Sequence, residues 1–555
     1  MMTRHKLVAF CSSRTNFISI WRIVGFLIGL ALVCLPQARA GGAVTSCDEN
    51  SLRTALSGGG LVTFDCSGTI TVTLANGGSI QISYDTTIDG NGQNVIISGG
   101  GNLGVFFVPA GVKLNLNKLT IANAAGGFGA IENEGTLTVT NSTFSGNNGF
   151  DAGGIGNGGG TVTVRNSTFS GNSSQRDGGG IANEAGTLTV RNCKFTSNTG
   201  TYGGGITNIT LYNSPATLTV NNSTFSGNSA QIDGGGIEND AGTLTVTNST
   251  FSGNTGYSEA GGIENDGGTA TVTNSTFFGN TGIYVGGGIE NYLGTLTVIN
   301  STLSGNISGE GGGLAASSPS TSRLVNTIVV NSCSNPYGGL MDGGGNLNWP
   351  AGRGCPGINV DPMLDPSGLQ NNGGPTKTLA LLAGSPAAPA SAPQTSNCPI
   401  RDQRGFPRPF ASPCSIGAYE PGTLFKSFRV NDGASSFTAN SFAVSGTFTL
   451  GADSDPNINP PMDVVRLRFG TFTIIIPAGS FAPTAAGSFV YGGVPPPGGV
   501  TFQMTIQPLG GSLYAFRASA TGQNIMAGTT SPVTVQLTVD DDGGTTRTPV
   551  DPNDD

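Results

Sequence analysis

Residues 217–237 read TLTVNNSTFSGNSAQIDGGGI, and variants of this stretch occur seven times between Thr136 and Leu314. Phenylalanine, or leucine in the last unit, stands at positions 144, 169, 195, 225, 251, 277 and 303, so successive units are 25, 26, 30, 26, 26 and 26 residues apart. A period of this size is typical of a solenoid, in which each unit buries its apolar face only against its neighbours. The repeat therefore indicates the shape of the molecule before it indicates any chemistry.

The repeated unit has the composition of short strands and turns. Its TLTV segment alternates polar and apolar residues, as a half-buried strand does, and the rest is too rich in glycine, asparagine and serine for a helix. We expect three short strands in each unit. If equivalent strands stack at the usual spacing, the chain forms an all-β parallel β-helix of about 10–12 coils.

Two columns of asparagine support this register. One follows the first strand, at positions 141, 166, 192, 222, 248, 274 and 300, and the other comes two residues after the isoleucine of GGGI, at 133, 157, 183, 208, 239, 265 and 291. Asparagine tolerates left-handed backbone, and its amide can bond the identical amide one coil away. We interpret both columns as structural ladders at turns and not as binding residues.

Several motifs resemble those of known families. FSGN followed by GGGI is similar to the repeats of polymorphic outer-membrane proteins, and the stacked coils resemble the pectin-lyase-like superfamily of right-handed parallel β-helices. Residues 47–55, CDENSLRTA, resemble the C-S-L-R-E-A entry motif of secreted bacterial β-helix proteins, with an insertion and Thr54 in place of glutamate. These resemblances imply a right-handed coil, and they carry no catalytic residues across to this chain, because the families are defined by architecture.

The segment behind the repeats resembles the choice-of-anchor Q module that closes many such chains. The similarity rests on NGGPTKTLAL at 372–381, DQRGFPRP at 402–409 and IGAYE at 416–420. The acidic residue usual before IGA is absent, since Cys414 and Ser415 stand there. Together the resemblances cover about residues 44–421.

The composition changes along the chain and predicts six parts. These are a signal peptide (1–40), an N-terminal cap (41–68), the β-helix (69–350), the closing module (351–421), a small antiparallel β-sandwich (422–545) and a disordered tail (546–555). The sandwich is expected because alternating or apolar runs recur between glycine and proline turns.

Residues 1–40 have the features of a secretory signal. They carry five basic and no acidic side chains, an apolar run from Ile23 to Leu35, and Ala38-Arg39-Ala40 at the expected cleavage site. Removing them would change the net charge from −9 to −14 and would remove His5, the only histidine. No later apolar run reaches the roughly 20 residues of a membrane helix. We therefore expect a monomer that is extracellular or at the cell surface, with no transmembrane segment after cleavage.

This composition excludes several functions. An acidic chain with few lysines is a poor partner for nucleic acid, which requires clustered cations. A mature chain without histidine cannot use a Ser-His-Asp triad or a histidine metal site.

The cysteines predict three local disulfides. Cys47 with Cys66, Cys333 with Cys355, and Cys398 with Cys414 are close in sequence and lie outside the regular repeats. Each bridge would close a short loop in an exported protein. Cys193 takes the place of the serine of NSTF, and we interpret it as a small packed side chain and not as a reactive thiol.

Acidic residues also recur in columns. Glu238, Glu264 and Glu290 occupy equivalent positions in consecutive units, and Asp240 and Asp266 lie two residues further on. A second column contains Asp151, Asp177, Asp233, Glu259 and Glu310. Stacked carboxylates repel one another, so an aligned column is unfavourable unless water or cations screen it. We favour a solvated outer face with no cofactor, and a Ca²⁺-binding stripe formed by the first five residues remains as the alternative.

The predicted function is non-catalytic. The superfamily that the chain resembles includes pectate lyases, which combine Ca²⁺ with an arginine base, and polygalacturonases, which need a histidine that is absent here. The only stacked arginines, Arg165 and Arg191, lie in units without the Glu238 column. We predict a non-catalytic, exported repeat protein for adhesion or glycan binding, whose partner is a polysaccharide or a neighbouring or host cell surface. A polysaccharide lyase or hydrolase remains the alternative.

Overall fold

The structure is a computed structural model. It describes residues 41–555 except 338, 383, 389–397, 409–413, 425, 432–434, 451–457, 462, 464, 478, 494–499, 540–541 and 549–555. The predicted signal peptide and most of the predicted tail lie outside the described residues.

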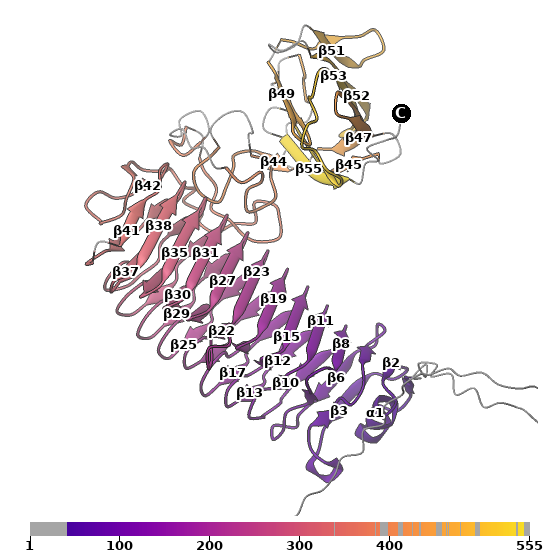
Figure 1. The fold of residues 1–555 in the computed structure, drawn as a ribbon, viewed down its shortest axis with the longest axis vertical. Coiled ribbons are helices and arrows are strands. Elements are labelled where there is room, and N and C mark those ends of the chain that lie inside the picture. The colour runs from indigo at the N-terminus through magenta and orange to yellow at the C-terminus, as the bar shows by residue number, and fades with distance from the viewer. Residues whose placement is uncertain are drawn as a thin grey trace, which may run out of the picture. The chain divides into compact units, whose positions relative to one another are not determined.

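The repeats form a parallel β-helix, and the predicted fold class is confirmed (Figure 1). One unit comprises β27 (Thr243–Thr247), β28 (Thr250–Ser252), β29 (Thr255–Gly256) and β30 (Ile263–Asp266). The first six of the seven units thus have a fourth strand that the sequence did not predict. This strand has two residues, too few to show any alternation of polar and apolar side chains.

Equivalent strands of successive units stack into four sheets. The TLTV strands form a 13-stranded sheet from β1 (Ala43–Val44) to β41 (Leu340–Asp342), and the phenylalanine strands form another of 13 from β3 (Gly68–Thr71) to β43 (Ile358–Asn359). The strands after GGG form an 11-stranded sheet from β4 (Ile80–Gln81) to β40 (Cys333–Ser334). The two-residue strands form a short sheet of six, from β13 (Asn148–Gly149) to β33 (Thr281–Gly282).

The stacked phenylalanines fix the register. From Phe144 to Phe277, neighbouring rings lie 4.7–4.8 Å apart between centroids, with interplanar angles of 3–7°. All six rings are fully buried. Residues about 26 positions apart in sequence therefore lie directly above one another, as the repeat predicts.

The glycines before each core isoleucine permit close packing of the coils. A Cβ atom on Gly236 would lie 2.5 Å from the carbonyl oxygen of Gly262 and 2.9 Å from the Phe251 ring. No side chain fits in this space, which accounts for the recurrence of glycine at the third position of GGGI.

Asparagine ladders run along the turns. The column from Asn133 to Asn291 is buried, and each amide donates to the next at 2.6–2.7 Å. The column from Asn141 to Asn300 has the expected left-handed backbone, with φ from 44° to 54°. A third ladder, which the sequence analysis missed, is formed by the asparagine of FSGN, and Asn228 for example donates to Asn254 at 2.9 Å.

The entry motif forms a helix that the sequence did not predict. Helix α1 (Glu49–Leu56) is capped at its N-terminus by Asp48, whose side chain accepts a hydrogen bond from the Ser51 N–H at 2.9 Å. Leu52 and Leu56 of this helix join the apolar core of the first coils. The helix thus covers apolar groups that would otherwise be exposed at the end of the solenoid.

The three disulfides have the expected pairing, Cys47–Cys66, Cys333–Cys355 and Cys398–Cys414. Cys193 is free and buried, and burial raises the pKa of its thiol to about 11. Its environment is that of a core side chain.

The C-terminal region contains two further sheets around a separate apolar core. One has the order β44-β55-β54-β48-β49, and the other has the order β45-β47-β53-β52-β51-β50, with β46 paired to β47. Their bounds are β44 (Thr423–Leu424), β45 (Ser427–Val430), β46 (Ser436–Thr438), β47 (Ser441–Thr449), β48 (Val465–Phe469), β49 (Phe472–Ile476), β50 (Ala482–Pro483), β51 (Phe489–Gly493), β52 (Thr501–Gly510), β53 (Leu513–Thr521), β54 (Val533–Val539) and β55 (Asp542–Thr548). Within the described residues, no helix has the length and hydropathy that a membrane span requires.

Candidate functional site

The acidic columns meet at one bend of the β-helix. Strands β26 (Ile237–Asp240), β30 and β34 (Ile289–Tyr292) are adjacent in the 11-stranded sheet, in register at Glu238, Glu264 and Glu290. Along each strand the isoleucine and asparagine point into the core, so the glutamates point to the opposite side. Of the second acidic column, Asp233 lies in the bend before β26 and Glu259 in the bend before β30, whereas the bend before β34 has Val285 at the equivalent position.

The expectation of a solvated acidic face is wrong for the three glutamates. Glu238, Glu264 and Glu290 are only 5%, 2% and 3% exposed. The glycine-rich bend folds back over the outer side of the strand, and a Cβ atom on Gly234 would collide with the backbone of Ile237 and Glu238. The bend therefore removes the carboxylates from water, while Asp240 and Asp266 are half-buried.

The folded-back bend brings carboxylates of the two acidic columns together. Carboxylate oxygens of Asp233, Glu259 and Glu264 lie within 4.8 Å of one another. These three residues, with Glu238 and Glu290, are here called the central acidic cluster. Of the five residues predicted as a Ca²⁺ stripe, Glu264 belongs to this close group, and Asp240 and Asp266 do not. In the sequence, Asp233 and Glu259 belong to a separate column, because the path of the bend over the strand cannot be read from the repeat.

The central acidic cluster is unfavourable for negative charge. Burial, followed by the charge of Glu259, raises the pKa of Asp233 and of Glu290 to about 7. Burial also raises the pKa of Glu238 and Glu264 well above the ordinary value. Glu238 accepts a hydrogen bond from the Thr207 hydroxyl at 3.1 Å, whereas the Oε2 atoms of Glu264 and Glu290 are buried without a hydrogen-bond partner.

A second acidic cluster, earlier in the β-helix, is paired with a positively charged side chain. Carboxylate oxygens of Asp151, Asp177 and Glu184 also lie within 4.8 Å of one another. The Arg176 guanidinium lies 2.8 Å from Asp151 and 3.6 Å from Asp177. By contrast, none of the ion pairs between described residues involves the central acidic cluster.

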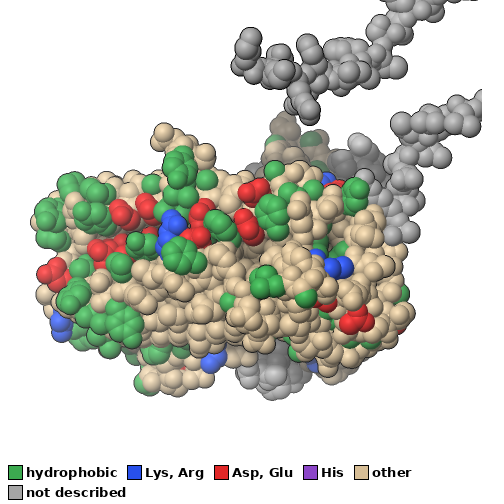
Figure 2. Space-filling view, turned by 90° about the horizontal axis from the view of Figure 1, so that it is seen from below, with side chains coloured by type: hydrophobic (Ala, Val, Ile, Leu, Met, Phe, Trp, Pro, Cys, Tyr) green, Lys and Arg blue, Asp and Glu red, His purple; other side chains and the backbone are tan. Residues whose placement is uncertain are grey.

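Exposed apolar side chains lie beside the acidic residues. They occupy the bends between the short six-stranded sheet and the 11-stranded sheet, and they are Phe150, Ile232, Tyr257, Ile283 and Tyr284, here called the apolar row. Backbone hydrogen bonds stack these bends, for example from the Glu259 N–H to the Ile232 carbonyl at 3.0 Å. Figure 2 shows a face on which acidic side chains gather with hydrophobic side chains beside them.

The stacked arginines do not join this site. Arg165 and Arg191 lie in register on β15 (Thr161–Arg165) and β19 (Thr187–Arg191), in the sheet of TLTV strands, and both are exposed. The carboxylates belong to the other side of the coil, on and before the 11-stranded sheet. The structure therefore does not bring an arginine base from this pair to the acidic cluster.

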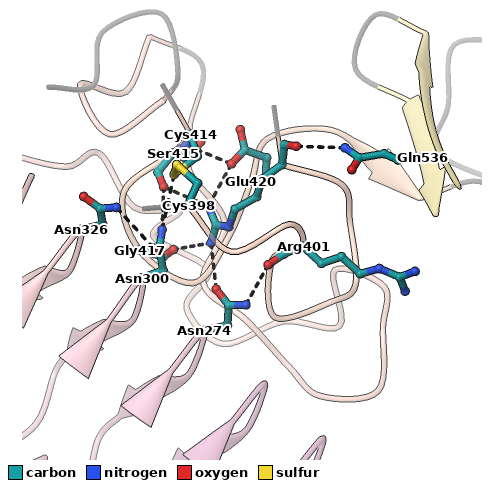
Figure 3. The surroundings of a disulfide bond; sticks show 11 residues. Asn274, Asn300, Asn326, Cys398, Arg401, Cys414, Ser415, Gly417, Glu420 and Gln536 are labelled. Atoms are coloured by element: carbon teal, nitrogen blue, oxygen red, sulfur yellow. Dashed lines mark hydrogen bonds and ion pairs between the residues drawn. A yellow bond between two sulfur atoms is a disulfide. The ribbon is translucent and has the colours of Figure 1, made fainter. Parts of the chain in front are cut away.

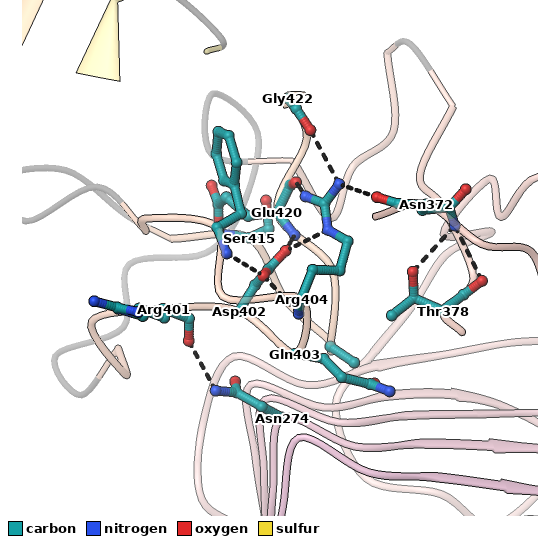
Figure 4. A network of polar contacts seen from close by, with 12 residues as sticks. Asn274, Asn372, Thr378, Arg401, Asp402, Gln403, Arg404, Ser415, Glu420 and Gly422 are labelled. Carbon is teal, nitrogen blue, oxygen red and sulfur yellow. Dashed lines mark hydrogen bonds and ion pairs between the residues drawn. The ribbon is translucent and has the colours of Figure 1, made fainter. Parts of the chain in front are cut away.

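The motif residues of the closing segment (residues 351–421, within the described positions) have structural roles. Arg404 forms an ion pair with Asp402 at 2.8 Å (Figure 4). Its guanidinium also lies over the Tyr419 ring, 3.9 Å from the ring centroid. Arg408 is fully buried and donates to Glu420 at 2.9 Å and to the carbonyl groups of Ser415 and Gly417. These groups hold the irregular segment in one conformation.

The closing segment packs along one side of the β-helix. Asn274 donates to the Arg401 carbonyl at 2.7 Å, and Asn300 donates to the Ser415 carbonyl at 3.2 Å (Figure 3). The Gln403 amide bonds the hydroxyl groups of Thr250 and Thr276 at 2.8 and 2.6 Å. The motif thus covers the outer side of the coils.

Comparison with family models agrees with this architecture. Residues 54–251 match the family described as the right-handed beta helix region. A mutant of the PL6 family alginate lyase AlyGC is similar among solved structures, at 14% identity and a TM-score of 0.32, over 62% of this chain and 56% of that one. The chain thus corresponds to little more than half of the length of that structure. The comparison with curated proteins gave no match. The chain contains a right-handed parallel β-helix.

The raised pKa values predict a pH dependence in buffer free of divalent cations. Asp233 and Glu290 titrate at about 7 in the folded chain, against 3.8 and 4.5 for the ordinary groups. Between these values the unfolded chain releases protons that the folded chain retains, so rising pH favours unfolding until both states are ionised above about 7. Melting in EDTA should therefore show that an Asp233→Asn/Glu290→Gln variant gains stability relative to the wild type as pH rises from 4 to 7. A constant difference between the two proteins would contradict the prediction.

Proposed function

We propose that this protein is exported and acts without catalysis, as a β-helix that binds glycans outside the cell or at its surface. The observation that carries the proposal is the apolar row, in which Tyr257 and Tyr284 are 54% and 66% exposed on consecutive coils. Exposed apolar groups arranged together mark interaction sites, and tyrosine combines a flat apolar ring with a polar hydroxyl. Sugar rings have the matching combination of apolar faces and polar edges.

The repeat gives the proposed contact its strength. Ile283 follows in register with Tyr257 one coil on, and Tyr284 stands next to it. Exposed apolar side chains thus recur on consecutive coils at the spacing of stacked strands, so a regular polymer can touch several of them at once. Many weak contacts on one rigid surface combine into a strong one without any single deep pocket. Export is supported by the signal-like residues 1–40 and by three disulfides, which persist in oxidising surroundings.

A glycan array tests the proposal directly. The full mature chain should bind at least one class of polysaccharide, and a Tyr257→Ala/Tyr284→Ala variant should bind about tenfold more weakly, because central aromatic contacts often contribute more than 1 kcal/mol. Tyr337→Ala is the matched control, since Tyr337 is exposed but lies outside the apolar row. Binding that is equal in all three proteins would contradict the assignment of the surface.

An enzymatic role is tested with the same ligands. Incubation of the protein with the polysaccharides it binds should release neither reducing ends nor unsaturated sugars. Turnover that disappears in a Glu264→Gln variant would replace the binding proposal with that of a polysaccharide lyase or hydrolase.

A further inference from the structure

We propose that the central acidic cluster is a Ca²⁺ site, in which Asp233, Glu259 and Glu264 hold the ion and Glu238 and Glu290 supply further oxygen atoms. This inference goes beyond the proposed function and does not depend on it. It concerns the stability of the β-helix at the coils that carry the central acidic cluster.

Carboxylate oxygen atoms from different coils converge at the central acidic cluster. Asp233 precedes β26, while Glu259 precedes β30 and Glu264 lies on it, and their oxygens come within 4.8 Å of one another. Two adjacent coils thus direct carboxylates at one point from both the bend and the strand. An ion there would join the coils to each other.

Two carboxylate oxygen atoms of the cluster are buried without a hydrogen-bond partner. Glu264 is 2% exposed, and its Oε2 atom has no hydrogen-bond partner. The same holds for Oε2 of Glu290. A buried carboxylate oxygen without a partner is costly, and binding a metal ion is one of the few ways to satisfy it.

Another acidic cluster of the same β-helix is paired with an arginine. The earlier cluster of Asp151, Asp177 and Glu184 also combines carboxylates of the bends with one from a strand, and there Arg176 supplies a positive charge. Its strand residue, Glu184, stands at the position of Asp240 and not at that of Glu264. The residue at the equivalent position of the unit that contains Asp233 is Ile232. The central acidic cluster therefore has more carboxylates and lacks the cation that the chain provides at the earlier one.

The ligand chemistry favours calcium. The site offers carboxylate oxygens only, from at least three and as many as five residues, and Ca²⁺ takes six to eight oxygen ligands in flexible geometry. Mg²⁺ requires near-octahedral geometry and retains several waters, so it is less suited to a cluster enclosed by protein. Zinc and copper prefer nitrogen or sulfur ligands, which the five residues do not provide.

The test uses the full mature chain after treatment with EDTA, titrated with CaCl₂ in a calorimeter and melted with and without the ion. We expect heat of binding and a higher melting temperature in CaCl₂. Glu264→Gln and Asp233→Asn should each weaken binding about tenfold or more, since affinity follows the number of charged ligands. Both variants should be at least as stable as the wild type in EDTA, because each removes repulsion, and this shows that they fold.

Glu310→Gln is the matched control. Glu310 belongs to the same column as Asp233 and Glu259 but is exposed, and the strand that follows it carries Ala315 in place of a glutamate. Its variant should bind Ca²⁺ as the wild type does. The proposal is overturned if millimolar CaCl₂ gives neither heat nor a melting shift, which would mean that the cluster holds protons instead. It is also overturned if Glu264→Gln and Asp233→Asn bind as tightly as the wild type.

The glycan array separates this result from the proposed function. Glycan binding that persists in EDTA together with positive calcium titrations would support both proposals independently. Loss of Tyr257 and Tyr284 should not change the calcium titration.

Discussion

Replacing Phe251 with alanine should lower the free energy of unfolding by about 3–5 kcal/mol, the usual range for a large buried aromatic side chain. The Phe251 ring is fully buried and lies 4.8 Å from the Phe225 ring and 4.7 Å from the Phe277 ring. The rigid coils on both sides cannot close the resulting cavity without breaking the register of the stack. Urea denaturation followed by circular dichroism measures the effect.

Ser252→Ala provides the matched control for this prediction. Ser252 is the next residue on β28 and is half-buried on the opposite side of the strand. Its variant should change stability by no more than about 0.5 kcal/mol. If Phe251→Ala changed the free energy of unfolding as little as Ser252→Ala, the stacked phenylalanine rings would not stabilise the β-helix, and the proposed register would be wrong.

Replacing Arg408 with alanine should be similarly damaging, at about 3–5 kcal/mol, because it leaves the buried Glu420 carboxylate without its ion pair. Arg408 also donates to the backbone carbonyls of Ser415 and Gly417, so its loss removes the hydrogen bonds that order this part of the closing segment. Thermal melting, together with limited proteolysis between residues 351 and 421, should show loosening of the segment.

A double variant separates charge from packing. Arg408→Met/Glu420→Leu replaces the buried pair with apolar groups, and such replacements are often neutral or stabilising. We expect it to recover much of the stability lost in Arg408→Ala. If the double variant is as unstable as the single one, the hydrogen bonds to the backbone matter more than the unpaired charge.

The sequence was sufficient to predict the β-helix because the fold repeats itself. In a solenoid, equivalent residues of successive units lie next to one another. A column such as Val220, Val246 and Val272 in the sequence therefore predicts both which residues are in contact and the register of their strands. The disulfide partners were also predictable, since each pair closes a short loop outside the repeats. The two-residue strands and helix α1 were not predicted. The strands are too short to show a pattern, and the helix depends on a cap at Asp48 and on the core that receives Leu52.

The acidic site shows what only the tertiary structure decided. The sequence aligned Glu238, Glu264 and Glu290 and left open whether water or a cation surrounds them. Whether a carboxylate on the outer side of a strand is solvated depends on the path of the preceding bend, and periodicity carries no information about that path. The glycine-rich bends fold back over the strand, bury the glutamates and bring Asp233 and Glu259 to them. The repeat thus determined which residues stack along the coil, whereas the folding of each bend determined which residues meet across it.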